Sequence, residues 1–352
     1  MNNQLNFQQL QSNLDDVKKL LFNNFNNSLF CKDYKKLLKN KKLVFVGEDD
    51  GGIPIQNWDM RSDKYNQVKV NKIDIIEKEK FVFGIDSSCI KIAEVEDGGL
   101  YAIKGSTCVS FRGCPVTHFK IGPFLFYLNE DTLKNFQLDQ NVLKLMLYND
   151  DYAKKFLRVN FERYIQYWLS KTISNSVILI DGSLKYSIFE NRFYSILKII
   201  ENSVINKNLV IGVSKNTKIK ILKYFSYPLL NTQQPSFINI NLIISSIIRR
   251  VYGEHILIKF DENRYSSILR ADLVMFESGN DSNDGIAESL GILLFNEFIT
   301  NGYPSTLQLS HHVSTFSNTD LASIQSFIKS NYFIKELYNE NVRSSVLGSI
   351  WK

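Results

Sequence analysis

The sequence predicts an α/β protein with a mixed sheet, on three observations. Two apolar runs, 177–180 and 209–213, are separated by a helical stretch, which predicts parallel strands joined by a crossover helix. Residues 81–110 contain short, closely spaced strand patterns, which are typical of an antiparallel meander. Much of the rest repeats apolar residues at helical spacing. Parallel and antiparallel pairing are therefore both expected.

The composition places the chain among globular proteins. Of its 352 residues, 44% are hydrophobic and 13% aromatic, which supports a substantial core and excludes a disordered chain. The formal charge of +6 permits a nucleic-acid partner without requiring one.

The cysteines and the apolar runs bear on the location of the protein. The four cysteines have no CxxC spacing, which favours reduced thiols and a cytoplasmic setting; Cys108 and Cys114 could instead pair, or bind a metal with His118. The N-terminus lacks the apolar core of a secretory signal, and no apolar run approaches the roughly 20 residues of a membrane span. We therefore expect no membrane association.

The N-terminal region is expected to be an extension of the main domain. Residues 4–40 carry apolar positions at helical spacing, which predicts one or two amphipathic helices that pack on their own domain or dock a partner. Residues 46–80 contain Gly51, Gly52 and Pro54 and read as an irregular connection. We predict an N-terminal helical and irregular extension over 1–78, and a main domain over 79–352 with a C-terminal helical tail.

The first part of the main domain predicts a meander followed by helices. Four strands are expected at Phe81–Ile85, Cys89–Glu94, Gly99–Ile103 and Thr107–Ser110, with a hairpin at Asp97-Gly98-Gly99. Residues 131–171 return to helical spacing. Glu162 lies there among aromatic residues, and it belongs either to a solvated helix face or to a metal site.

Two apolar strand patterns each deliver an aspartate. Ser176–Ile180 is followed by Asp181-Gly182-Ser183, and Phe81–Ile85 is followed by Asp86-Ser87-Ser88. A single such aspartate usually caps its own turn, but burying a carboxylate is expensive unless it is paired or bound to metal. Two of them predict carboxylates that converge at one sheet edge, where Mg²⁺ or Mn²⁺ finds oxygen ligands.

The second half predicts more strands and helices around three further polar residues. The strand at 209–213 leads to Lys215, which either holds a phosphate or opens an exposed basic run. His311 follows the stretch 302–310, where an apolar strand or turn is expected, and is either a satisfied structural histidine or a metal ligand. The other expected elements are helices near 187–203, 219–230, 241–253, 286–298 and 319–329, and strands at 255–262 and 270–277.

Taken together, these motifs resemble the NurA family of DNA-end-processing nucleases over residues 80–330. The segments that carry the resemblance are Ile85-Asp86-Ser87-Ser88, Glu162, Leu179-Ile180-Asp181-Gly182-Ser183, Ile211-Gly212-Val213-Ser214-Lys215, and Tyr303-Pro304 followed by His311. Ser87 replaces the usual glycine of the family. His312 is an alternative to His311, but the spacing from Tyr303 favours His311.

The resemblance implies an RNase H-like (Piwi-like) core with a Mn²⁺- or Mg²⁺-dependent nuclease site that holds two ions. It implies Asp86, Glu162, Asp181 and His311 as metal ligands, with Lys215 and Tyr303 as further active-site residues. It also implies 5′-to-3′ exonuclease and single-strand endonuclease activity on single- and double-stranded DNA. The implied assembly is a homodimer that works with the hexameric ATPase HerA in end resection during double-strand break repair.

Other functions remain open at this point. A different RNase H-like nuclease, such as a Holliday-junction resolvase, would use the same carboxylates. A catalytically inactive adaptor would use the fold to bind DNA or an ATPase. An actin-like ATPase would need a glycine-rich phosphate loop after the first strand, and Asp86-Ser87-Ser88-Cys89 is a poor match.

Overall fold

The structure is a computed structural model, and it describes residues 42–45, 69–134, 140–215, 222–263, 266–275, 282–332 and 335–336. The helices expected within 4–40 and most of the connection at 46–80 lie outside the described residues. The boundary near residue 79 stays a prediction.

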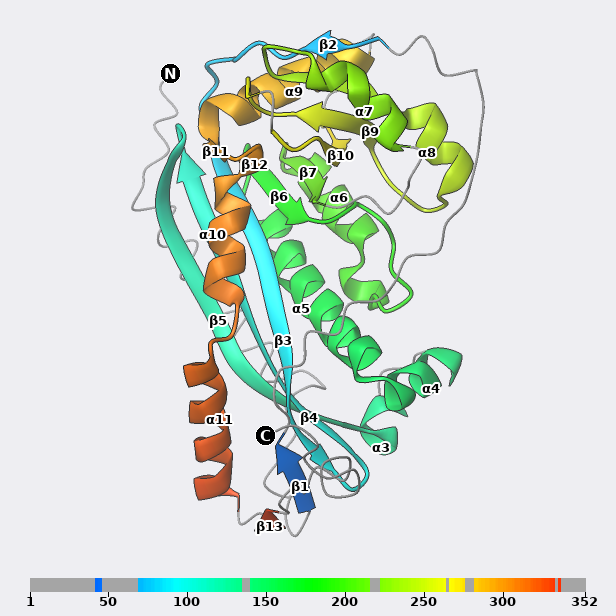
Figure 1. Ribbon diagram of the computed structural model, residues 1–352, viewed down its shortest axis with the longest axis vertical. Coiled ribbons are helices and arrows are strands. Elements are labelled where there is room, and N and C mark those ends of the chain that lie inside the picture. Colours follow the sequence, from blue (N-terminus) through cyan, green and yellow to red (C-terminus); the bar gives the residue numbers. More distant parts are fainter. Residues whose placement is uncertain are drawn as a thin grey trace, which may run out of the picture.

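In the part of the chain that the structure describes, an 11-stranded mixed sheet organises the molecule (Figure 1). Its main path runs β13-β1-β3-β6-β7-β10-β9-β8-β2. Two strands lie off this path: β4 pairs with β3, and β5 pairs with β4. The strands are β1 (Lys42–Phe45), β2 (Asn71–Lys72), β3 (Phe81–Val95), β4 (Gly98–Phe111), β5 (Cys114–Asn129), β6 (Val177–Asp181), β7 (Leu209–Ser214), β8 (Ser236–Asn239), β9 (Glu254–Lys259), β10 (Leu269–Val274) and β13 (Lys335–Glu336). A separate small sheet contains β11 (Ile299–Thr300) and β12 (Tyr303–Pro304).

The centre of the sheet confirms the predicted mixed pairing. Strands β5, β4 and β3 are antiparallel neighbours, β6 runs parallel to β3, and β7 runs parallel to β6. Three antiparallel strands followed by two parallel ones, in the order β5-β4-β3-β6-β7, form the expected RNase H-like core. The crossover between β6 and β7 contains α6, as the sequence predicts.

The meander is longer than its sequence pattern suggests. The two short strands expected at 81–85 and 89–94 are one strand, β3, and those expected at 99–103 and 107–110 are one strand, β4. Polar residues such as Ser87 and Ser88 look like a break in the sequence, but each has a partner on β4, in a register that is regular from Phe81 to Lys91. The expected hairpin joins the two strands, and β5 was not predicted.

Helices cover the sheet on both faces. They are α3 (Glu130–Lys134), α4 (Gln140–Tyr148), α5 (Asp150–Thr172), the 3₁₀ helix η2 (Arg192–Tyr194), α6 (Ile196–Ile205), α7 (Leu222–Leu230), α8 (Asn241–Ile247), α9 (Ser282–Asn296), α10 (Ser305–Ser314) and α11 (Asn318–Asn331). The helix expected at 187–203 begins later, and that at 241–253 ends earlier. Both differences lie at helix ends, where some backbone groups have no hydrogen-bond partner within the helix and the boundary is hardest to predict. Within the described residues, no helix is long and apolar enough to cross a membrane.

Helices α5 and α10 lie on opposite faces of β3. Alternate side chains Phe81, Phe83 and Ile85 join a hydrophobic cluster with α5, whereas Val82 joins a different cluster with Leu307 of α10. A β-carbon at Gly84 would lie 2.8 Å from the side chain of Thr306, so glycine is what lets α10 approach the strand. One strand therefore receives functional groups from both faces.

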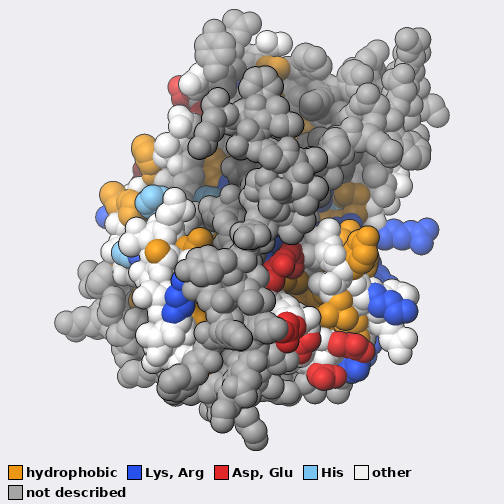
Figure 2. All heavy atoms as spheres, turned by 60° about the horizontal axis from the view of Figure 1, so that its bottom comes forward, with side chains coloured by type: hydrophobic (Ala, Val, Ile, Leu, Met, Phe, Trp, Pro, Cys, Tyr) orange, Lys and Arg blue, Asp and Glu red, His pale blue; other side chains and the backbone are white. Residues whose placement is uncertain are grey.

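The end of the molecule near α3 and α11 is shown in Figure 2. Acidic, basic and apolar side chains of the described residues are intermingled on this face. Cys89, Cys108 and Cys114 are free thiols, in agreement with the expectation of unpaired cysteines.

Candidate active site

The candidate site lies at the end of β6. The neighbouring strand β3 continues past this point to Val95. The parallel pairing stops at Ile85 and Ile180, so Asp86 and Asp181 are the next residues of two neighbouring strands. Gly182 follows with a φ of 114°, a conformation that glycine adopts most readily, and turns the chain away from the sheet. From Asp86 onward, β3 has no partner on β6. We call this place, where β6 ends at Asp181 beside Asp86 of β3, the notch. Side chains from both faces of the sheet reach it.

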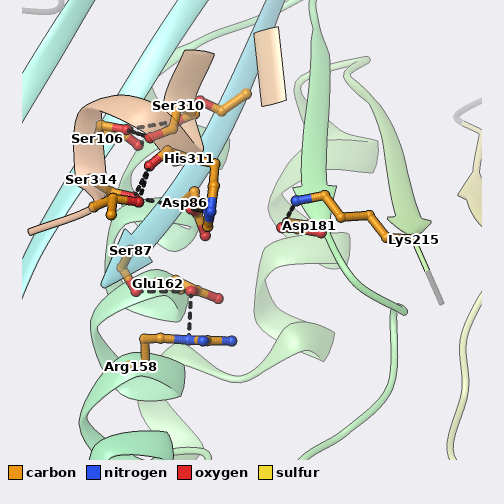
Figure 3. A network of polar contacts seen from close by, with 12 residues as sticks. Asp86, Ser87, Ser106, Arg158, Glu162, Asp181, Lys215, Ser310, His311 and Ser314 are labelled. Atoms are coloured by element: carbon orange, nitrogen blue, oxygen red, sulfur yellow. Dashed lines mark hydrogen bonds and ion pairs between the residues drawn. The ribbon is translucent and has the colours of Figure 1, made fainter. Parts of the chain in front are cut away.

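Asp86 is held on the α10 side of the sheet. Its side chain is buried, and its Oδ2 accepts a hydrogen bond from Ser314 Oγ at 3.0 Å and lies 2.8 Å from His311 Nδ1 (Figure 3). Because a carboxylate only accepts, the neutral imidazole carries its hydrogen on Nδ1 and leaves the lone pair of Nε2 free. His311 is thus oriented by Asp86 and remains largely exposed.

Asp181 faces a cation and a phenol. Lys215 Nζ donates to its Oδ2 at 2.9 Å, and Tyr303 Oη donates to its Oδ1 at 3.1 Å. The Lys215 ammonium also lies 4.9 Å from the centre of the Tyr303 ring. Burial and then the Asp181 carboxylate raise the pKa of Tyr303, so its hydroxyl stays protonated and acts as a donor.

Glu162 enters the notch from α5, on the other face. Ser87 Oγ donates to its Oε1 at 2.8 Å, and Arg158 Nε lies 3.5 Å from the same oxygen. The Glu162 side chain is 14% exposed, so it does not belong to a solvated helix face. Burial, assisted by the negative charge of Asp86, raises the pKa of Glu162 to about 7 despite the opposing Arg158 charge.

Helix α10 is fixed by buried polar contacts along its length. Ser310 Oγ lies 2.8 Å from Ser106 Oγ and donates to the carbonyl of Gly84 at 3.0 Å. At its first turn, the buried carboxylate of Glu297 accepts from the Thr306 backbone N–H at 2.7 Å and from three nearby hydroxyl groups. These contacts set the position of His311 one to two turns further along the helix.

Three of the predicted ligands form a group suited to a metal ion. Ligand atoms of Asp86, Asp181 and His311 all lie within 4.8 Å of one another. Two ligands on opposite sides of a small divalent ion are separated by about 4.2 Å, so little adjustment is required. Two carboxylates and an imidazole, without thiolate, suit Mg²⁺ or Mn²⁺. Glu162 is outside this group but interacts with Asp86 through its charge.

The structure brings all six predicted site residues to one notch and adds two that the sequence analysis missed. Asp86 was expected at the end of a short strand and lies within a long one, and His311 was expected after an apolar strand or turn and lies within a helix. Ser314 and Arg158 also reach the site, and both had a sequence signal: Ser314 follows His311 by three residues and Arg158 precedes Glu162 by four, spacings that place helical side chains on one face.

Comparison with known proteins identifies a family. A family model described as "NurA domain" matches residues 81–316. A solved structure titled "Crystal structure of NurA" is similar over 79% of this chain and 92% of its own, with 10% identity and a TM-score of 0.42. Marinitoga piezophila Argonaute, solved with a 5′ OH guide RNA, aligns over 69% of this chain and 30% of its own, with 15% identity and a TM-score of 0.29. Aquifex aeolicus Argonaute aligns over 69% and 29%, with 12% identity and a TM-score of 0.25. A comparison with curated proteins gives no match.

Proposed function

Because this chain belongs to the NurA family, which is a nuclease family, we propose that it is a divalent-metal-dependent deoxyribonuclease. Family membership supports a nuclease-type role in DNA end processing. The observation that carries the metal-dependent proposal is the convergence of Asp86, Asp181 and His311 within 4.8 Å. These side chains come from β3, β6 and α10, and their convergence requires the folded sheet.

One or two Mn²⁺ or Mg²⁺ ions would be held by Asp86, Asp181 and His311, together with Glu162. When bound, such ions supply Lewis-acid stabilisation of the phosphate and a water of lowered pKa. The carboxylates of the chain supply the negative charge that binds such ions. Ser314 orients the carboxylate of Asp86 by a hydrogen bond, and Ser87 orients that of Glu162.

Lys215 and Tyr303 would act on the substrate. The Lys215 ammonium pairs with Asp181 in the absence of DNA, and it is half-exposed and able to turn toward an incoming phosphate. There it would offset charge that develops on the phosphate oxygens. Tyr303 keeps its hydroxyl proton, so it can donate to the attacking water or to the strand.

The finer activity that we propose follows the family. It consists of 5′-to-3′ exonuclease and single-strand endonuclease action, with Mn²⁺ or Mg²⁺ as the ion, in resection of DNA double-strand breaks. The proposed assembly is a homodimer that works with a HerA-type hexameric ATPase. Partner stimulation is checked by comparing cleavage with and without the ATPase.

The test of the proposed function is cleavage of end-labelled linear DNA with Mn²⁺, Mg²⁺ or EDTA, by the wild type and by Asp181→Ala. We expect metal-dependent shortening of the labelled strand that EDTA and the substitution both abolish. Asp151→Asn is the control, because this exposed acid on α5 pairs with Lys154. Cleavage that survives in Asp181→Ala would reject the assignment of the site. A wild-type protein that cuts no DNA, even with its ATPase, would favour an adaptor.

A further inference from the structure

Arg158 is a cation in the candidate site to which the mechanism above assigns no role. Its side chain is 56% exposed, and its Nε lies 3.5 Å from Glu162 Oε1. Figure 3 shows its guanidinium beneath Glu162, on the side of the notch away from α10. An arginine here is therefore accessible to a ligand while it remains next to the carboxylates.

Arg158 lies on the α5 side of the carboxylate group. Its Nε is 3.5 Å from Glu162 Oε1, and Ser87, the residue after Asp86, donates to the same oxygen at 2.8 Å. Lys215 contacts the same group from the β7 side, through Asp181. Two cations thus flank the acids, one from α5 and one from the end of β7.

We propose that Arg158 binds a phosphate of the DNA strand in the site, opposite Lys215, and so positions the strand for cleavage. When metal ions neutralise the carboxylates, the guanidinium is less strongly held by Glu162. Its planar fork of N–H donors matches two phosphate oxygens, which the point charge of a lysine does not. This inference rests on the proposed nuclease function, because it requires a nucleic-acid strand in the site.

The test separates phosphate binding from mere support of Glu162. Binding of a fluorescein-labelled single-stranded oligodeoxynucleotide is measured by anisotropy over a range of salt concentrations, with Ca²⁺ in place of Mn²⁺ and with a gel to verify an intact probe. Each phosphate contact on a single strand contributes about 0.7 to the slope of log affinity against log salt. We expect Arg158→Gln to reduce this slope by about 0.7, and Arg158→Lys to retain it while lowering kcat/KM for cleavage.

Lys171→Gln is the matched control, since Lys171 is an exposed cation on the same helix that stacks on Tyr167 and Trp168. An unchanged slope in Arg158→Gln, or an equal loss in Lys171→Gln, would overturn the proposal. A shifted pH profile with an unchanged slope would show that Arg158 serves only Glu162. Because binding is measured without cleavage, a wild type that binds DNA but never cuts it would reject the nuclease function and leave this result interpretable.

Discussion

At the scale of residues, the geometry of α10 distinguishes two adjacent histidines. His311 Nδ1 lies 2.8 Å from Asp86, and its ligand atom belongs to the metal-binding group. His312 is the next residue on the helix, where side chains rotate by about 100° per residue, so it points away from the group. Sequence spacing favoured His311, and the structure gives the physical reason.

Substitution of each histidine tests this distinction. We expect His311→Ala to lower the DNA cleavage rate by about 100-fold or more, since a lost metal ligand costs several kcal/mol and each 1.4 kcal/mol is tenfold. His312→Ala is the control and should cleave like the wild type. Equal losses in both variants would contradict the assignment of His311.

The raised pKa of Glu162 has a consequence for stability. The folded carboxyl has a pKa of about 7, against 4.5 in its ordinary state, so the metal-free folded protein binds more protons than the unfolded chain between these values. Stability therefore falls as pH rises from about 4.5 to 7, and the ionised group destabilises the folded protein above that window.

Glu162→Gln should remove the destabilisation that the ionised carboxylate causes above pH 7. We expect the metal-free variant to be more stable than the wild type at pH 8 by about 3 kcal/mol and to lose most of the difference at pH 4.5, in denaturant unfolding at each pH. Its DNA cleavage should fall sharply, because a ligand carboxylate is gone. Glu201→Gln, at an exposed ion pair on α6, is the control. A variant less stable than the wild type at pH 8 would show that the Ser87 and Arg158 contacts outweigh the burial.

At the scale of elements, α10 is held at its first turn by a buried carboxylate. The buried Glu297 carboxylate accepts from the first turn of this helix and from Ser110 of β4. Glu297→Ala would leave the Thr306 N–H without this acceptor and open a cavity. We expect a loss of about 3 kcal/mol of unfolding free energy, measured in denaturant. Glu288→Ala, an exposed position on α9, should change it little; equal stability of the two variants would contradict the anchoring role.

The elements also show what sequence patterns can resolve. Short buried strands such as β6 and β7 were predictable, because continuous apolar runs mark them and Asp181-Gly182 ends the first. The meander strands were predicted too short, because Asp86 and Ser87 look like turn residues. In the structure both residues pair with β4, so β3 continues through them. Strand β5 contains Pro115, Gly122 and Pro123, which weaken a strand pattern, and only its pairing with β4 reveals it.

At the scale of the whole molecule, the site is a product of topology. Helix α10 brings His311 to Asp86 across 225 residues of sequence, and the parallel register of β3 and β6 brings Asp181 beside Asp86. The order and local setting of the six residues identified them in the sequence. Arg158 was missed although it precedes Glu162 by four residues on the helix, because Glu162 itself becomes part of the site only when α5 packs on the sheet.

The two ends of the described chain meet far from this site. Strand β13 pairs with β1, and β1 pairs with Ala93, Glu94 and Val95 of β3. At about 3.3 Å per residue, that pairing lies roughly 25 Å along β3 from Asp86.

Anomalous diffraction from crystals of the wild type grown with Mn²⁺ would locate the metal ion. We expect a manganese peak at the notch, within bonding distance of Asp86, Asp181 and His311, and its loss in crystals of Asp181→Ala. A map without a peak at this position, at a Mn²⁺ concentration that supports DNA cleavage, would contradict the proposed metal site. A peak bound by other side chains alone would do the same.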